Sequence, residues 1–191
     1  DIDLVLFDKT GTLTEGHPSV SDIFVAEGFA EETVLAVAAS LESRSEHPLA
    51  TAILLRATEL GIVHQTVTAY EAVPGRGLKG LLENIPYSLG NELFVKESGA
   101  LLGTSLVRFT NEARAAGKTI VFVAKEKDII GAIAVADRIR EDAKVAIERL
   151  REMGIDVGLV TGDHEASAQA VAAQVGIQQV LANTLPTRKA E

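Results

Sequence analysis

The chain has 191 residues, of which 47% are hydrophobic and 24% charged, and its formal net charge is −9. This length can bury the core of one large domain or two small ones. The acidic balance argues against nucleic acid or an anionic membrane surface as the main partner. Cysteine is absent, so disulfides and thiolate metal sites are excluded within the chain. We identify no signal peptide and no apolar run of the roughly 18–20 residues that a membrane-spanning helix needs.

The first part of the chain predicts a strand followed by two helices. Residues 2–7 form a short, nearly continuous apolar run that ends at a polar turn, as a buried strand of a parallel sheet does. Residues 31–43 carry apolar side chains at helical spacing, and a second helix begins at Pro48 and stops at Gly61. The inner stripes of these helices are predicted to be Val34, Leu35, Ala38 and Leu41 in the first, and Leu49, Ile53, Ala57 and Leu60 in the second.

The middle of the chain predicts an antiparallel sheet with helices on one side. Residues 67–89 form short strands separated by glycine and proline, and a helix over residues 103–116 closes at Gly117. Residues 119–124 and 129–136 then form two strands that a charged turn joins.

Beyond Asp137 the pattern alternates between helix and strand. A helix that ends at Gly154 leads into a strand over residues 155–160, and a helix over residues 165–175 leads into a strand over 177–181. Such alternation predicts a parallel sheet covered by helices, which the opening strand would join. The expected fold class is therefore α/β, with a Rossmann-like parallel sheet interrupted by an inserted α+β domain that has an antiparallel sheet. Because the chain opens on a strand and stops inside continuing structure, we expect it to be a truncated fragment.

The string Asp8-Lys9-Thr10-Gly11-Thr12-Leu13-Thr14 directly follows the opening strand. A carboxylate at the carboxyl end of a parallel strand lies where open α/β sheets bind their ligands. Gly11 permits a sharp turn, and Asp8 can act there as a covalent nucleophile that forms an aspartyl phosphate. The alternative is an ordinary strand-end turn that is rich in turn-forming residues.

The whole string resembles the phosphorylation signature of P-type ATPases, which belong to the haloacid-dehalogenase-like superfamily. Three later segments resemble further motifs of that family: Thr161-Gly162-Asp163 its T-G-D motif, Asp137 its acid at the hinge between domains, and Leu185 to Lys189 its L-P-x-x-K segment. Taken singly, each could be a surface turn, an acid at a helix N-terminus or a solvated lysine, but they occur in the family's order.

The resemblance implies catalytic roles for seven residues. Asp8 would accept the phosphoryl group, Lys9 and Lys189 would compensate its charge, and the remaining catalytic candidates are Thr10, Thr161, Gly162 and Asp163. Soluble phosphatases of the superfamily usually have a second Asp two residues after the nucleophile, where this chain has Thr10. Without a carboxylate to activate water, the phosphoenzyme should persist, as a pump needs.

Mg²⁺ and ATP are the expected cofactors. Asp8 and the Thr10 carbonyl would be the metal ligands, since Mg²⁺ prefers oxygen ligands in octahedral geometry. The family's G-D-G-x-N-D segment, which supplies another carboxylate, is absent from these 191 residues. We therefore expect this stretch of chain to turn over little ATP by itself.

The middle section resembles the nucleotide-binding domain of the heavy-metal class. Its first candidates are Glu46 and His47 of the S-E-H-P motif and Glu42, which precedes that motif. The others are Gly75 and Gly77 of a glycine loop, and the later pair Gly90 and Asn91. His47 could stack on or hydrogen-bond adenine, Glu42 could accept from its amine, and the glycines would let the backbone approach the nucleotide. The alternatives are an ordinary turn for the glycines and a helix cap for His47. His17, His64 and His164 lack metal-ligand spacing and are expected to be solvated.

Together these motifs imply a phosphorylation domain over residues 1–19 and 129–191, with a nucleotide-binding domain over residues 20–128. The expected protein is a copper or zinc-type pump at the cytoplasmic face of a membrane. Its partners would be ATP or ADP and the transmembrane and actuator domains of the same protein, and this part would not bind the transported ion. A soluble phosphatase with a cap domain and a non-catalytic nucleotide-binding module remain as alternatives.

Overall fold

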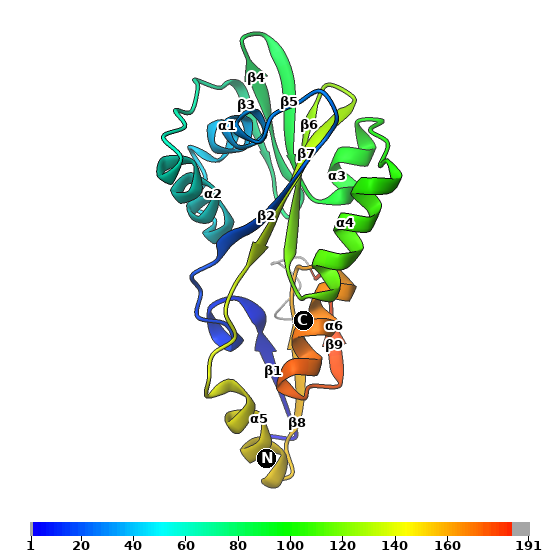
Figure 1. Cartoon of the computed structure of the whole chain (residues 1–191). Coiled ribbons are helices and arrows are strands. Elements are labelled where there is room, and N and C mark those ends of the chain that lie inside the picture. Colours follow the sequence, from blue (N-terminus) through cyan, green and yellow to red (C-terminus); the bar gives the residue numbers. More distant parts are fainter. Residues whose placement is uncertain (1, 185–191) are drawn as a thin grey trace. The chain divides into compact units, whose positions relative to one another are not determined.

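Residues 2–184 are described by the computed structural model (Figure 1), in which the chain forms two compact units. Unit 1 contains residues 2–17, 112–119 and 136–184, and unit 2 contains residues 18–111 and 120–135. The predicted boundaries of the phosphorylation and nucleotide-binding domains, at residues 1–19, 129–191 and 20–128, remain a prediction. No helix within residues 2–184 has both the length and the apolar character needed to cross a membrane.

Unit 1 contains a parallel sheet, as the alternation of helix and strand predicts. Its strands, in spatial order, are β1 (Leu4–Asp8), β8 (Asp156–Val160) and β9 (Gln179–Leu181). Both pairings are parallel, with Asp8 opposite Val160 and Val160 opposite Leu181. The three strands therefore end at one edge of the sheet, which brings the residues that follow them together.

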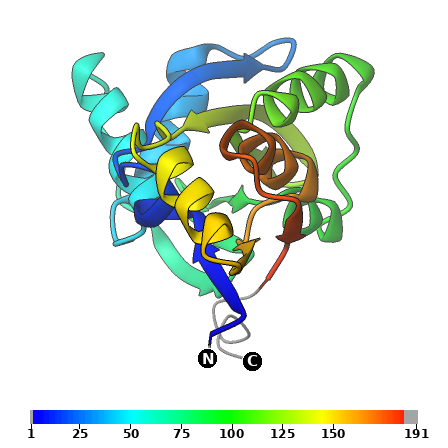
Figure 2. The same cartoon turned by 90° about the horizontal axis from the view of Figure 1, so that it is seen from below.

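Helices α5 (Ala143–Glu152) and α6 (Glu165–Val175) contact each other and pack against β8 and β9, respectively (Figure 2). Val157 and Leu159 of β8 share one buried cluster with residues of both helices, so both cover the same face of the sheet. On the other face Leu4 and Leu6 are 45% and 43% exposed. The prediction of a buried opening strand is thus met only on the face that Phe7 shares with the cluster.

Unit 2 contains a six-stranded sheet whose strands β3 to β6 pair antiparallel. In spatial order the strands are β2 (Ser19–Val25), β7 (Asp128–Ala136), β6 (Thr119–Lys125), β5 (Ile85–Gly90), β4 (Gly77–Leu82) and β3 (Thr68–Val73). The antiparallel sheet of the middle section is confirmed, whereas β2 was not predicted.

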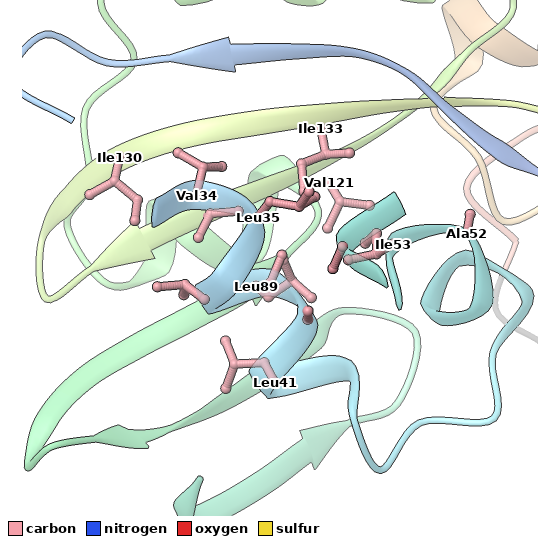
Figure 3. Close-up of a cluster of buried hydrophobic side chains, with 14 of the residues drawn as sticks. Val34, Leu35, Leu41, Ala52, Ile53, Leu89, Val121, Ile130 and Ile133 are labelled. Atoms are coloured by element: carbon pink, nitrogen blue, oxygen red, sulfur yellow. The ribbon is translucent and has the colours of Figure 1, made fainter. Parts of the chain in front are cut away.

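The core of unit 2 lies between this sheet and helices α1 (Glu31–Glu42) and α2 (Pro48–Glu59), as Figure 3 shows. All four predicted inner residues of α1, namely Val34, Leu35, Ala38 and Leu41, are fully buried. Burying one such leucine or valine stabilises the fold by about 1.5–3 kcal/mol. In α2 the prediction is wrong for Leu60, which is 46% exposed because the helix ends one residue earlier.

Two further helices lie between β5 and β6 in the chain, and the second of them runs from unit 2 into residues 112–115 of unit 1. Helix α4 (Thr104–Ala115) agrees with the prediction, and Gly117 follows it with a φ of +77°. Helix α3 (Glu92–Glu97) packs against β5 and was not predicted.

Candidate functional site

The turn after β1 has a backbone geometry that depends on Gly11. Thr10 has φ −75° and ψ 122°, and Gly11 has φ 78° and ψ −6°. These angles are those of a type II turn, whose third residue needs a positive φ and is therefore usually glycine. The Thr14 amide closes the wider Lys9–Leu13 loop by donating to the Lys9 carbonyl at 3.1 Å. Thr10 lies exposed on this loop, while Asp8 is half-buried at its start.

The T-G-D segment lies next to Asp8 at the carboxyl edge of the sheet. Thr161 directly follows Val160, the residue that pairs with Asp8, and its side chain is 3% exposed. Its amide donates to the Leu181 carbonyl at 2.9 Å and its carbonyl accepts from the Thr184 amide at 3.0 Å, which fixes the backbone before Gly162. Asp163 turns back, because its amide donates to the Thr161 hydroxyl oxygen at 3.2 Å.

Lys9 and Asp163 form an ion pair in which the side chains are only 6% and 14% exposed. Lys9 therefore does not extend into solvent, as a lysine in an ordinary surface turn would. The pair joins the first predicted motif to the T-G-D segment and brings the catalytic candidates Asp8, Lys9, Thr161, Gly162 and Asp163 into one region of unit 1. Lys189, the remaining charge-compensating candidate, lies outside the described residues.

Asp137 forms hydrogen bonds with the segment that follows the Lys9–Leu13 loop. Its Oδ2 atom accepts from the Thr14 hydroxyl at 2.5 Å and from the Gly16 amide at 3.2 Å, and its Oδ1 atom accepts from the His17 amide at 3.2 Å. Residues 13–15 and 138–140 also pair antiparallel through backbone hydrogen bonds. Asp137 thus holds the end of the Asp8 loop, and its role as a hinge remains a prediction.

In unit 2, the glycine loop is a turn that the strands themselves require. The Arg76 amide donates to the Val73 carbonyl at 3.0 Å, and Gly75 has a φ of +70° inside this turn. A Cβ atom on Gly77 would lie 2.2 Å from the Leu89 carbonyl oxygen and 2.7 Å from the Gly90 Cα atom. Close strand pairing therefore explains Gly77 and Gly90 without a ligand, which leaves the turn interpretation open beside the nucleotide one.

Asn91 ties this turn to the start of helix α3. Its side-chain oxygen accepts from the Phe94 amide at 2.9 Å as the N-cap, and its side-chain nitrogen donates to the Gly75 carbonyl at 3.1 Å. Four of the nucleotide candidates, Gly75, Gly77, Gly90 and Asn91, therefore form one cluster.

Glu42 is the buried acid of unit 2, at the end of helix α1. The residue is 6% exposed, and its Oε2 atom has no hydrogen-bond partner within the described residues. Burial raises the pKa of the Glu42 carboxyl above its ordinary value, and a hydrogen bond with the Ser45 side chain lowers it in part. A buried carboxylate oxygen without a donor is costly, so a donor from a ligand would stabilise it.

The Glu42 end of α1 lies over strand β4. A Cβ atom on Gly80 would lie 3.4 Å from the Leu41 side chain, so the residue before Glu42 packs against Gly80. Gly77 lies three residues before Gly80 on the same strand, about 10 Å from it at the usual rise per residue. The acid and the glycine cluster thus lie on adjoining elements of unit 2.

His47 is exposed and is the N-cap of helix α2, where its Nδ1 atom accepts from the Leu49 amide at 3.2 Å. The alternative of a helix cap is therefore correct for one ring nitrogen, Nδ1. Glu46 beside it is exposed. His164, expected to be only solvated, caps α6 in the same way, with its Nδ1 atom accepting from the Ala166 amide at 3.2 Å.

The described residues contain no group of three or more His, Cys, Asp or Glu side chains that could hold a metal ion. Asp8 and the exposed Thr10 offer oxygen atoms beside the sheet edge, which is the donor type that Mg²⁺ prefers. Two protein oxygens suit this ion in kind but are too few to enclose it.

Comparisons with known proteins agree with the motifs. The chain is 39% identical to the copper-exporting P-type ATPase B of Archaeoglobus fulgidus over 191 residues, which cover 100% of this chain and 27% of that protein. It is 37% identical to the zinc-transporting ATPase of Bacillus subtilis, with coverages of 98% and 29%. The chain thus spans about a quarter of the length of the curated relatives it matches.

A solved structure supports the same relationship. The catalytic domain of the CPx-ATPase CopB-B, studied for its conformational changes upon nucleotide binding, superposes with a TM-score of 0.76 at 25% identity. The match covers 99% of this chain and 64% of that one. A family model for haloacid dehalogenase-like hydrolases matches residues 2–189. The chain therefore belongs to the haloacid dehalogenase-like hydrolase family, and its relatives within it are copper- and zinc-transporting P-type ATPases.

Proposed function

We propose that this chain is the ATP-binding and phosphorylation part of a P-type ATPase that transports a heavy-metal cation. The observation that carries the proposal is the meeting of two distant motifs at one sheet edge. Asp8 ends β1, Thr161 follows the paired strand β8, and Lys9 forms a buried ion pair with Asp163. A carboxylate, a hydroxyl and an ammonium group in this arrangement suit the transfer of a phosphoryl group.

Asp8 is the nucleophile of the proposed reaction. Its carboxylate oxygen attacks the γ-phosphorus of ATP, the bond from that phosphorus to the bridging oxygen breaks, and ADP leaves with the bond's electron pair. Lys9 compensates part of the charge on the phosphoryl oxygens, a role that Lys189 shares. Hydrolysis of the aspartyl phosphate by water later releases inorganic phosphate and restores the Asp8 carboxylate.

Thr161 supports the transfer through its hydroxyl proton. Because its oxygen accepts from the Asp163 amide, the proton is directed elsewhere and can be donated to a phosphoryl oxygen. Gly162 leaves the backbone beside Thr161 without a side chain, and Thr10 places no second carboxylate in the Asp8 loop. The phosphoenzyme therefore lacks a local general base and persists.

Mg²⁺ would be held by the Asp8 carboxylate and the Thr10 carbonyl together with ATP oxygens, and when bound it would neutralise charge on the phosphates. Asp8 and Thr10 alone provide too few ligands for tight binding.

The nucleotide base is proposed to bind in unit 2. Glu42 accepts from the exocyclic amine of adenine, which gives its unpartnered oxygen a donor. The Nε2 side of His47 contacts the base, with Glu46 beside it. The cluster of Gly75, Gly77, Gly90 and Asn91 presents backbone atoms to the rest of the nucleotide.

The parent protein would use this phosphorylation to drive ion transport, with the chain on the cytoplasmic face of the membrane. Its transmembrane and actuator domains would be the partners, and the transported ion would bind outside this chain. Copper and zinc transporters both occur among the relatives, so either ion suits the proposal. A soluble phosphatase is not favoured by these relatives.

Phosphorylation of Asp8 tests the proposal directly. The full-length protein is incubated with ATP labelled at its γ-phosphate, and acid-stable, hydroxylamine-sensitive label is counted. The wild type is expected to become labelled, and Asp8→Asn to lose the label while ATP affinity changes less than about twofold. An unlabelled wild type that still binds ATP would instead support the non-catalytic binding module, and label on Asp8→Asn would remove Asp8 from its role.

A further inference from the structure

Thr119 lies between the two charged side chains that unit 1 brings together. Its hydroxyl oxygen accepts from the Lys9 ammonium at 3.3 Å, and its proton is donated to Asp163 Oδ1 at 3.0 Å. Lys9 also pairs with the other carboxylate oxygen of Asp163. The three groups therefore form a closed triangle in which the hydroxyl uses one acceptor site and its only proton.

The segment that carries Thr119 is anchored on helix α6. The Ser167 hydroxyl donates to the Lys118 carbonyl at 2.6 Å, immediately before Thr119. Gly117 lies against the same helix, since a Cβ atom there would come within 3.1 Å of the Val171 side chain. Ser167 is 1% exposed, so this contact is part of the packed interior of unit 1. The position of Thr119 is thus set by backbone anchoring as well as by its own hydrogen bonds.

Lys9 is buried and Asp163 and Thr119 are partly buried, which makes the third member of the triangle important. An ion pair removed from water loses hydration, and its attraction offsets that loss only where further hydrogen bonds satisfy the remaining atoms. Thr119 supplies such a bond to both partners at once. Without its hydroxyl, Asp163 Oδ1 would lose this donor and the Lys9 ammonium would lose one of its acceptors.

Asp163 connects Thr119 to the phosphoryl-transfer site, because it contacts Thr119 through its carboxylate and Thr161 through its amide. Its amide donates to the Thr161 hydroxyl, which leaves the Thr161 proton for a phosphoryl oxygen. A change in the Asp163 carboxylate would therefore move the Lys9 charge, and it would redirect the Thr161 proton where the Asp163 backbone moves with it. Both effects act on the transfer of the phosphoryl group rather than on the binding of adenine.

We propose that Thr119 is a positioning residue for phosphoryl transfer, which holds the Lys9 ammonium and the Asp163 carboxylate in the orientation that the reaction needs. The inference rests on the proposed function. No motif signals the residue in the sequence, because Thr119 is 110 residues from Lys9 and acts through contacts that only folding creates.

The experiment compares three variants of the full-length protein. Thr119→Val removes the hydroxyl at nearly constant volume, and Thr119→Ser retains it. The matched control is Thr110→Val, which removes the hydroxyl of another threonine, a buried one that donates at 2.7 Å to the Leu106 carbonyl within α4. The measurements are the rate of hydroxylamine-sensitive phosphoenzyme formation from labelled ATP, the ATP dissociation constant, the midpoint of thermal unfolding, and the concentration of orthovanadate that halves the phosphoenzyme level.

Thr119→Val is expected to slow phosphoenzyme formation about tenfold and to raise the orthovanadate concentration severalfold, with ATP affinity within about twofold of the wild type. Thr119→Ser should restore the rate to within about threefold, and Thr110→Val should leave it unchanged. Equal rates for Thr119→Val and the wild type would overturn the proposal while the proposed function stands. An equal loss in Thr119→Val and Thr110→Val, tracking their thermal midpoints, would also overturn it, since the effect would then be structural. A wild type without phosphoenzyme would instead count against the proposed function.

Discussion

Replacing Glu42 should separate the cost of this buried acid for folding from its use in binding. Its Oε2 atom has no hydrogen-bond partner in the described part of the chain, and the residue is 6% exposed. Leaving a buried acceptor unsatisfied costs about 1–3 kcal/mol. Glu42→Leu, which removes that acceptor, is therefore expected to raise the free energy of unfolding of the nucleotide-free chain by about 1 kcal/mol.

Replacing Glu42 should weaken nucleotide binding, although it stabilises the fold. A hydrogen bond to a charged group contributes about 1.5–3 kcal/mol and a neutral one about 0.5–1.5 kcal/mol. Glu42→Gln, which keeps an acceptor but loses the charge, should weaken ATP binding by about 1 kcal/mol, or about fivefold in the dissociation constant. Glu42→Leu should weaken it by at least about tenfold, because it loses the whole bond.

The pH dependence gives a second signature. Burial raises the pKa of the Glu42 carboxyl in the folded chain, so the unfolded chain releases its proton first. The contribution of Glu42 to stability therefore falls as pH rises from about 4.3, the ordinary glutamate pKa, through the raised folded value. Glu42→Gln has no ionisable group at this position, so its stability relative to the wild type should rise as pH increases through this window.

Calorimetry with ATP and urea unfolding at several pH values measure these quantities, with Glu32→Gln as the control. Glu32 lies exposed at the other end of the same helix, so its substitution should change neither affinity nor the pH profile. If Glu42→Gln and Glu42→Leu both bound ATP as the wild type does, Glu42 would not contact the base. If their stability followed the wild-type pH profile, the account of its burial would be incorrect.

Three further predictions follow from the same contacts. His47→Asn should keep the cap of helix α2 and so change stability little, yet weaken ATP binding severalfold in calorimetry, whereas His47→Ala should also lose about 1 kcal/mol of unfolding free energy; equal affinity in both would remove the imidazole from the site. Asp137→Ala should lower the unfolding free energy measured in urea by about 2–3 kcal/mol, because three donors lose their charged acceptor, and a loss under about 0.5 kcal/mol would contradict the fastening role. ATP and ADP should bind this chain with similar affinity in Mg²⁺ and in EDTA, since Asp8 and Thr10 offer too few ligands; binding that required Mg²⁺, with rapid phosphate release, would show a complete cation site.

The sequence alone determined the features that depend on neighbouring residues. The Lys9–Leu13 loop follows from a glycine whose positive φ the turn needs, and helix α1 follows from apolar residues at helical spacing, all four of which are buried. Alternating helices and strands likewise indicated the parallel sheet. Short elements escaped the prediction, since α3 has six residues and is shorter than the window that reveals helical periodicity.

Only the tertiary structure decided how these local features combine. The ion pair of Lys9 with Asp163 and the bridging hydroxyl of Thr119 join residues far apart in the chain, and no local pattern encodes their distance. The glycines at positions 77 and 90 resemble a ligand-binding loop in the sequence, yet the structure shows that each is required by the strand opposite. The sequence did not reveal the burial of Glu42 either. Whether a helix residue is buried or exposed depends on which other elements pack against it, and the local sequence does not determine that.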